Sequence, residues 1–189
     1  MFIPTIQETT NNGEKIYDIY SKLLENRIIF INGEINDNLS NLVISELLYL
    51  DSLSKDDIDI YINSPGGSVT SGLAIVDTMN FIKSDVRTIV TGIAASMASI
   101  ILANGSKGKR CSLKNSEVMI HQPIGNTSGQ ATDIVIQAKR INKKKKLLNK
   151  LLSSLTNQDI KVIEKDTERD NFFTSKEALD YGLIDYIIE

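Results

Sequence analysis

The chain has 189 residues, of which 41% are hydrophobic and 24% are charged. This length and composition predict one globular domain with enough apolar material for a core, and they exclude a disordered, collagen-like or disulfide-rich protein. Lys and Arg number 21 against 24 Asp and Glu, and the net charge of −3 gives no electrostatic reason to expect nucleic acid as a partner.

Neither a targeting signal nor a membrane span is predicted. Residues 1–8 lack a basic stretch followed by an apolar one. The longest mostly apolar run, residues 92–103, is shorter than the about 20 residues that cross a bilayer. The lone Cys111 cannot form an internal disulfide, which favours a reducing compartment. We therefore expect a cytoplasmic protein with no membrane partner.

In chain order, a polar segment at residues 1–15 is typical of a mobile arm or hairpin. After it, residues with helical apolar spacing alternate with short β-branched runs that end in turn residues. Helices are expected at residues 16–25, 38–53, 68–82, from 94, 131–155 and near 174–178. Strands are expected at residues 27–31, 58–62, 86–92, a pair at 109–113 and 117–121, and 184–188. This alternation predicts an α/β fold with crossover connections.

Two of the expected helices carry further predictions. Helix 38–53 offers five apolar residues for burial, namely Leu42, Ile44, Leu47, Leu48 and Leu50. Helix 131–155 would be about 37 Å long at about 1.5 Å per residue, which is more than a domain of this size needs. We expect it to project and its apolar residues, such as Ile134, Ile141 and Leu148, to need a partner. The run Lys143–Lys146 indicates a solvated helix face rather than a nucleic-acid patch.

The single histidine, His121, ends an apolar strand beside a turn, where reactive side chains are often presented. With one histidine and one cysteine, a tetrahedral zinc site is not expected, and no other metal site is predicted. A histidine base needs a nucleophile, and Ser96 follows a strand and begins a helix, whose free N–H groups suit a developing oxyanion. A plain helix-capping serine is the alternative interpretation.

Gly66–Gly67 is a second oxyanion candidate, because adjacent glycines expose their N–H groups to an approaching chain. Phosphate binding is the rival, but neither common Gly-rich phosphate motif is present. For a carboxylate that orients the histidine, Asp166, Glu168 and Asp170 lie together, and composition does not choose among them.

Four segments, in order, strongly resemble ClpP, the proteolytic subunit of the Clp protease. They are Tyr61–Val69 (YINSPGGSV), Ala94–Met97 (AASM), Met119–Pro123 (MIHQP) and Asp166–Asp170 (DTERD), and the likeness runs from about Ile3 to Ile188. The resemblance implies the ClpP/crotonase-like α/β fold of repeated β-β-α units with a projecting handle helix, over residues 1–189 as one peptidase domain.

The resemblance implies a serine endopeptidase with Ser96 as nucleophile, His121 as general base and Asp170 as the orienting carboxylate. Backbone N–H groups of Gly67 and Met97 would form the oxyanion hole. Substrate would pair with the handle strand at Ile124, Gly125 and Asn126, although Asn126 replaces a glycine of the family.

The resemblance also implies an assembly. Residues of about 124–155 would form the handle that interlocks two stacked heptameric rings into fourteen subunits, and the arm at 1–15 would line the axial entrance. Substrates would be unfolded proteins and peptides, delivered by a AAA+ unfoldase. No cofactor is implied, because only the partner unfoldase uses ATP.

In the family, unfoldase loops dock in apolar clefts at the ring face. The corresponding residues here are Asp59, Tyr61, Phe81, Ile89, Thr91, Cys111, Leu113 and Ile188. Asp59 and Cys111 stand where aromatic residues are usual or common, and Thr91 where an apolar residue is usual. A buried, unpaired carboxylate costs on the order of a few kcal/mol, so we expect docking to be weakened or indirect.

Two alternatives stay open, and two further ones are disfavoured. Departures from the family pattern are typical of a second, diverged paralogue, a weakly active structural or regulatory ring subunit that works with another ClpP. Crotonase-like acyl-CoA enzymes share such oxyanion holes but do not need the complete triad. A Ser–Lys peptidase using Lys107 or Lys109 is made redundant by His121, and an α/β-hydrolase is disfavoured by the order Ser, His, Asp and the missing G-x-S-x-G motif.

Overall fold

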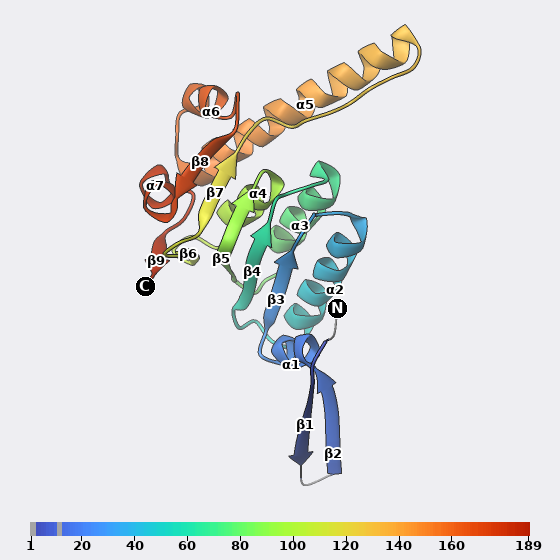
Figure 1. The fold of residues 1–189 in the computed structure, drawn as a ribbon, viewed down its shortest axis with the longest axis vertical. Coiled ribbons are helices and arrows are strands. Elements are labelled where there is room, and N and C mark those ends of the chain that lie inside the picture. Colours follow the sequence, from blue (N-terminus) through green and yellow to red (C-terminus); the bar gives the residue numbers. More distant parts are fainter. Residues whose placement is uncertain (1–2, 11–12) are drawn as a thin grey trace.

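The computed structural model describes residues 3–10 and 13–189, so residues 1–2 and 11–12 of the expected arm lie outside the described part. Its helices are α1 Ile19–Glu25, α2 Asp37–Leu53, α3 Val69–Phe81, α4 Met97–Ala103, α5 Ala131–Thr156, α6 Ile160–Asp166 and α7 Ser175–Tyr181. Its strands are β1 Thr5–Thr10, β2 Gly13–Asp18, β3 Ile28–Asn32, β4 Ile58–Ser64, β5 Val86–Ala95, β6 Arg110–Leu113, β7 Glu117–Ile120, β8 Asn171–Thr174 and β9 Tyr186–Ile188. The mixed architecture confirms the predicted α/β class (Figure 1).

The central sheet has the order β3-β4-β5-β6-β9, and β7 lies beside the end of β5. These pairings are parallel, whereas β8 runs antiparallel to β7. Helices α2 and α3 make the crossovers between β3, β4 and β5 and lie on the same side of the sheet (Figure 1). Parallel strands need such crossovers, and the strand ends therefore collect at one edge.

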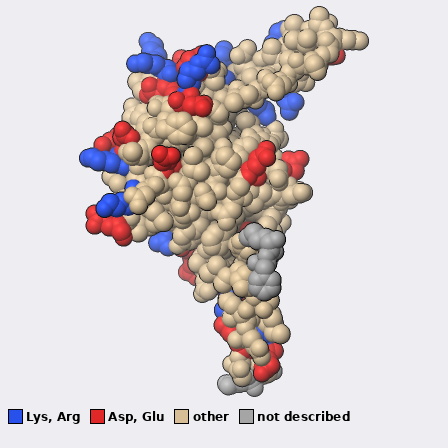
Figure 2. Space-filling model, viewed as in Figure 1, with Lys and Arg blue, Asp and Glu red and all other residues tan. Residues whose placement is uncertain are grey.

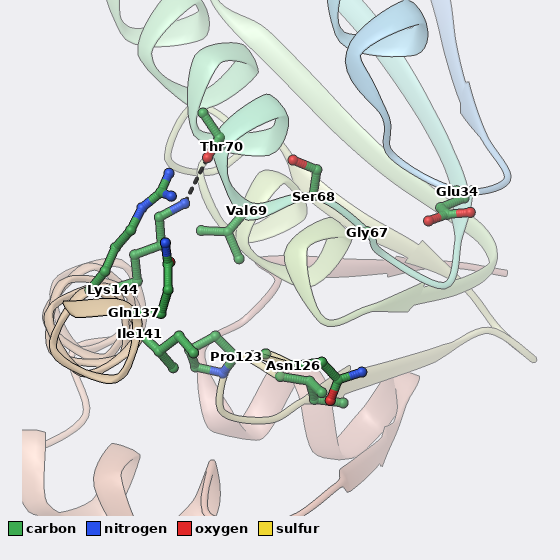
Figure 3. Close-up of a pocket in the computed structure, with 13 residues that line it drawn as sticks. Glu34, Gly67, Ser68, Val69, Thr70, Pro123, Asn126, Gln137, Ile141 and Lys144 are labelled. Atoms are coloured by element: carbon green, nitrogen blue, oxygen red, sulfur yellow. Dashed lines mark hydrogen bonds between the residues drawn. The ribbon is translucent and has the colours of Figure 1, made fainter. Parts of the chain in front are cut away.

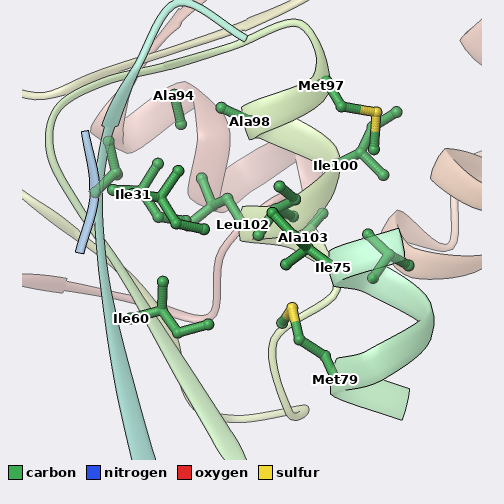
Figure 4. Packing of buried hydrophobic residues seen from close by; sticks show 14 of the residues in the cluster. Ile31, Ile60, Ile75, Met79, Ala94, Met97, Ala98, Ile100, Leu102 and Ala103 are labelled. Carbon is green, nitrogen blue, oxygen red and sulfur yellow. The ribbon is translucent and has the colours of Figure 1, made fainter. Parts of the chain in front are cut away.

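The core lies between this sheet and helices α2, α3 and α4. Figure 4 shows the part where residues of the sheet meet those of α3 and α4. Strand β4 shows how the sequence divides the two faces of the sheet. Ile58, Ile60 and Ile62 are fully buried, while Asp59 and Tyr61 alternate with them and are only partly buried. Side chains alternate across a strand, so the second face of the sheet is left partly open in this chain.

At the N-terminus, the expected hairpin is confirmed as β1 paired with β2, but the helix predicted from residue 16 begins later. Ile16 to Asp18 belong to β2. The Asp18 carboxylate accepts hydrogen bonds from the N–H groups of Tyr20 at 2.9 Å and Ser21 at 3.0 Å. This N-cap fixes the start of the helix at Ile19.

Several other expectations need correction. Strand β5 continues through Ala94 and Ala95, which were expected to open a helix. Strands β6 and β7 were expected to pair with each other, yet each pairs with β5, because β5 is ten residues long and offers each a separate stretch. Leu42 and Leu48 are exposed rather than buried. Helix α6 and strand β8 were not predicted.

The long predicted helix is confirmed as α5, which spans 26 residues and projects from the body (Figure 1). The segment before it, expected as a handle strand, forms no ladder with another described segment and runs along α5. It is held close to the helix at Gly125, where an added Cβ would collide with the Ile141 side chain. Within the described residues, we find no helix long and apolar enough to cross a membrane.

Candidate active site

Ser96 occupies a sharp reversal between β5 and α4. Its backbone is in an unusual conformation for a residue with a side chain, with φ 56° and ψ −120°. Such conformations cost of order ~1–3 kcal/mol and persist where surrounding contacts enforce them. Here the Ser96 N–H donates to the Met119 carbonyl at 2.8 Å, and the Ser96 carbonyl accepts from Ser99 Oγ at 2.6 Å. The turn therefore presents Ser96 Oγ at the carboxyl edge of the sheet.

Three side chains form one hydrogen-bonded row at this edge. His121 Nε2 lies 2.7 Å from Ser96 Oγ, and His121 Nδ1 lies 2.9 Å from Asp170 Oδ1. His121 directly follows β7 and Asp170 directly precedes β8, and these antiparallel strands pair Ile120 with Asn171. The strand register thus places the histidine beside the carboxylate. The His121 side chain is 13% exposed, whereas that of Asp170 is 61% exposed.

The structure distinguishes among Asp166, Glu168 and Asp170, the three candidates for the carboxylate that orients His121. Asp166 accepts a hydrogen bond from the Tyr181 hydroxyl at 3.0 Å. Glu168 pairs with Lys145 at 2.8 Å, and this hydrogen bond lowers the pKa of Glu168. Asp170 is the carboxylate that contacts His121, so the other two have structural partners of their own.

A polar network that sequence reasoning missed fixes the segment behind His121. Lys145 Nζ donates to Gln122 Oε1 at 2.9 Å as well as to Glu168. The Gln122 N–H donates to the Thr167 carbonyl at 2.6 Å, and Gln122 Nε2 donates to the Glu168 carbonyl at 2.8 Å. No sequence pattern predicts that Lys145 of α5 lies beside Gln122 and Glu168, so these contacts are visible only in the structure.

Two backbone N–H groups lie next to Ser96. Gly66 has φ 92°, and an added Cβ there would lie 2.7 Å from Ser96 Cβ, which shows how closely this turn approaches the serine. The Gly67 N–H has no hydrogen-bond acceptor among the described residues. The bonds to Ile35 involve its neighbours instead, because the Gly66 carbonyl accepts from the Ile35 N–H and the Ser68 N–H donates to the Ile35 carbonyl. Met97 is the first residue of α4, where an N–H has no intrahelical acceptor.

The predicted substrate-binding residues lie on the other side of the same site. Ile124, Gly125 and Asn126 are exposed, and with Gly67 they line a pocket of about 440 Å³ (Figure 3). The structure therefore brings an oxyanion candidate and the expected substrate strand to one opening. Among the described residues, no group of three or more His, Cys, Asp or Glu could hold a metal ion.

The predicted docking residues divide into two groups. Seven lie on strands β4, β5, β6 and β9, at the alternate positions whose side chains are on the face of the sheet opposite α2 and α3. They are Asp59, Tyr61, Ile89, Thr91, Cys111, Leu113 and Ile188. Phe81 ends α3 instead and is 79% exposed. The fold of one chain thus gathers the seven strand residues on one sheet and leaves Phe81 apart.

The carboxylate among them, that of Asp59, has a partner, so the cost of an unpaired carboxylate does not apply. Asp59 Oδ1 accepts a hydrogen bond from Arg87 Nε at 2.8 Å, and its second oxygen contacts Arg87 Nη2. The two residues are register partners on β4 and β5. Their pairing could not be predicted from the sequence without the register of these strands. Cys111 is fully buried, and burial raises the pKa of its thiol.

Taken together, a serine, a histidine and a carboxylate in hydrogen-bond contact beside free N–H groups define the geometry of a serine hydrolase site. Comparison with known proteins is more specific. The sequence model described as Clp protease matches residues 11–189. The chain is 56% identical over 188 residues, 99% of its length and 95% of the relative's, to the ATP-dependent Clp protease proteolytic subunit of Ligilactobacillus salivarius (strain UCC118).

The chain therefore belongs to the Clp protease family. It is a serine endopeptidase of the Clp type, as the resemblance implied.

Proposed function

We propose that Ser96, His121 and Asp170 are the catalytic residues of this peptidase. The observation that supports the proposal is the continuous row Ser96 Oγ–His121 Nε2–His121 Nδ1–Asp170 Oδ1, at 2.7 and 2.9 Å. A base within hydrogen-bond reach of the hydroxyl activates the nucleophile, and a carboxylate on the other ring nitrogen holds the tautomer that this base needs.

The chemistry follows from this arrangement. Ser96 Oγ attacks the substrate carbonyl carbon while its proton moves to His121 Nε2, and the resulting oxyanion accepts hydrogen bonds from the N–H groups of Gly67 and Met97. His121 then donates this proton to the departing amine, which leaves an ester on Ser96. Water, deprotonated by His121, attacks the ester and releases the new carboxyl end. No cofactor enters any of these steps.

The substrates we propose are unfolded proteins and peptides, bound in extended form along Ile124, Gly125 and Asn126. The extended, exposed course of this segment supports the proposal. Its backbone groups are available to an added strand, a common means of binding peptides without regard to sequence.

The proposal is tested by hydrolysis of an internally quenched peptide. Ser96→Ala should lower the rate by at least ~10⁴-fold, because it removes the nucleophile. Ser45→Ala, which alters an exposed serine on α2, is the matched control and should cleave at the wild-type rate. If Ser96→Ala cleaves as fast as Ser45→Ala, the assignment fails.

We also propose that residues 1–189 act as one peptidase domain and assemble with themselves as two stacked heptameric rings of fourteen subunits. Ile134, Val135 and Ile136 are exposed on the projecting α5, and a second apolar surface on α2 includes Tyr49 and Leu53. Exposed apolar patches of this kind mark contacts between proteins. Contacts through α5 would join the rings, and the enclosed chamber would hold the active sites.

The proposed ATPase partner is a AAA+ unfoldase, in keeping with the word "ATP-dependent" in the name of the relative. Its loops would dock on the seven strand residues Asp59, Tyr61, Ile89, Thr91, Cys111, Leu113 and Ile188. The neighbouring subunit would supply Phe81. The Asp59–Arg87 pair and Thr91 make this surface less apolar, and Cys111 is fully buried, so docking would be weakened. A cytoplasmic location accords with these partners.

A second candidate function is a diverged ring subunit of low activity that works with another ClpP. The polar docking surface, with the Asp59–Arg87 pair, favours it. Native mass spectrometry of the chain with and without a second ClpP decides between homomeric and mixed rings.

A further inference from the structure

The pocket of about 440 Å³ beside Gly67 has three walls. One is the start of α3, residues 67–70, and the second is the segment that follows His121, residues 123–126. The third is one face of α5, which contributes Gln137, Ile141 and Lys144 (Figure 3). A substrate whose carbonyl reaches the Gly67 N–H would therefore place its neighbouring side chain in this pocket.

The α5 wall carries two cations, Arg140 and Lys144, one helical turn apart. Lys144 Nζ donates to Thr70 Oγ1 at 2.7 Å, and neither cation has a carboxylate partner among the described residues. The pKa of Lys144 is lowered, first by burial and then by the charge of Arg140. Like charges at this spacing destabilise a helix.

Some cations elsewhere in the chain do have acidic partners, which the two cations of the pocket lack. The next residue on α5, Lys145, pairs with Glu168 at 2.8 Å, and Lys109 pairs with both Asp57 and Asp85. Arg140 and Lys144 line a pocket beside Gly67 without a carboxylate partner among the described residues, and this arrangement points to an anionic occupant.

The remaining lining residues define the shape of this occupant. Glu34 is the acidic residue of the lining and lies at the end of the pocket away from Lys144 (Figure 3). Between these two ends, Val69, Pro123 and Ile141 present apolar surface. A side chain that enters from the Gly67 side thus meets apolar groups first and cations at its tip. Glutamate, with an aliphatic stem and a terminal carboxylate, has this order of groups.

We propose that this pocket selects an acidic side chain, with glutamate preferred, at the substrate residue whose carbonyl Ser96 attacks. The guanidinium of Arg140 would donate two N–H groups to the carboxylate, and Lys144 would donate a third in place of its bond to Thr70. The inference rests on the proposed catalytic function and adds a substrate class to it.

The test compares two peptide series that differ only in Glu or Gln at the attacked position. Wild type should cleave the Glu series with a kcat/KM ~10-fold higher, because a paired carboxylate gains charge-assisted bonds that an amide does not. In Arg140→Gln/Lys144→Met this ratio should fall to about 2-fold or less. Lys139→Gln/Lys143→Met removes the same charge from exposed positions outside the pocket and should keep the wild-type ratio.

The same comparison is repeated with diphenyl phosphonate peptides that carry Glu or Gln and label the nucleophile, so that slow turnover does not hide the preference. Equal reaction of wild type with both series, or an equal fall of the ratio in the two double variants, overturns the pocket proposal while leaving the peptidase assignment intact. A wild-type chain that reacts with neither probe and cleaves neither series contradicts the proposed catalytic function itself.

Discussion

The carboxylate of Asp59 and the guanidinium of Arg87 pair across neighbouring strands, with Oδ1 of Asp59 2.8 Å from Nε of Arg87. The pair lies on the sheet face that carries the proposed unfoldase-docking residues. It satisfies the carboxylate, so Asp59 is not destabilising by itself, yet it places two charged groups where an apolar loop would bind. Replacing either partner leaves the other without its bond.

The first prediction concerns this surface. Asp59→Tyr together with Arg87→Gln, Thr91→Met and Cys111→Phe should tighten the Kd of a hydrophobic loop peptide by ~10-fold or more, because apolar anchors dominate such interfaces. Isothermal titration calorimetry measures the change. Asp180→Tyr, on the exposed side of α7, is the control and should bind as wild type does. Equal affinities for wild type and the quadruple variant would show that these residues do not limit docking.

The second prediction concerns the turn beside the nucleophile. Gly66→Ala should lower peptide hydrolysis by ~10²-fold or more, because the new Cβ displaces Ser96 and the N–H groups of the oxyanion hole. Gly108 also has a positive φ, of 84°, but an added Cβ there meets nothing within 4 Å. Gly108→Ala therefore shares the backbone strain, about 1 kcal/mol, and should retain activity. Loss of activity in both variants to the same degree would contradict the prediction.

The third prediction concerns assembly through α5. Ile136 is 55% exposed on the projecting helix, and Ile136→Glu should convert stacked rings into single rings, because burying the new charge is costly. Lys139→Glu, on the same helix and also exposed, is the control and should stay assembled. Analytical ultracentrifugation separates the two forms. A chain that is monomeric before mutation would refute the assembly itself.

The fourth prediction is a pH dependence of stability. Burial raises the pKa of Glu46 on α2 to about 7 from its usual 4.5. The folded state therefore keeps a proton that the unfolded state has released, and this residue lowers stability as the pH rises from about 4.5 to about 7.

Glu46→Gln should accordingly raise the free energy of unfolding by about 1 kcal/mol at pH 8, after allowance for partial exposure, and leave it unchanged at pH 4. Urea denaturation at the two pH values measures the difference. Glu164→Gln, on the exposed side of α6, should give no such gain. A gain that is the same at both pH values would assign the effect to packing rather than titration.

Much of the fold could be predicted, because the signals are local. Apolar runs such as Ile58–Ile62 and the alternating helices set the α/β class, and the capping box at Thr174 and Glu177 marked the last helix. The extent of β5 and the separate pairing of β6 and β7 could not be predicted, since both depend on strand register. Helix α6 is short, with only Ile163 among its buried residues, and leaves little periodic signal.

The candidate site was predictable for a different reason. Ser96, His121 and Asp170 come from motifs far apart in the sequence, and the resemblance to a family, not their spacing, selected them. Residues that act through the fold escaped this reasoning. Arg87 is opposite Asp59 only in the parallel register of β4 and β5, and Arg140 and Lys144 reach the pocket only because α5 folds back along residues 123–126.

The most direct test of the central claim is to label the nucleophile covalently and locate the adduct. The chain is treated with a fluorophosphonate, digested and sequenced by tandem mass spectrometry. We predict one adduct, on Ser96, that His121→Ala slows by ~10³-fold or more because the base is gone, while Ser45→Ala has no effect. An adduct on another residue, or undiminished labelling of Ser96→Ala, would contradict the account.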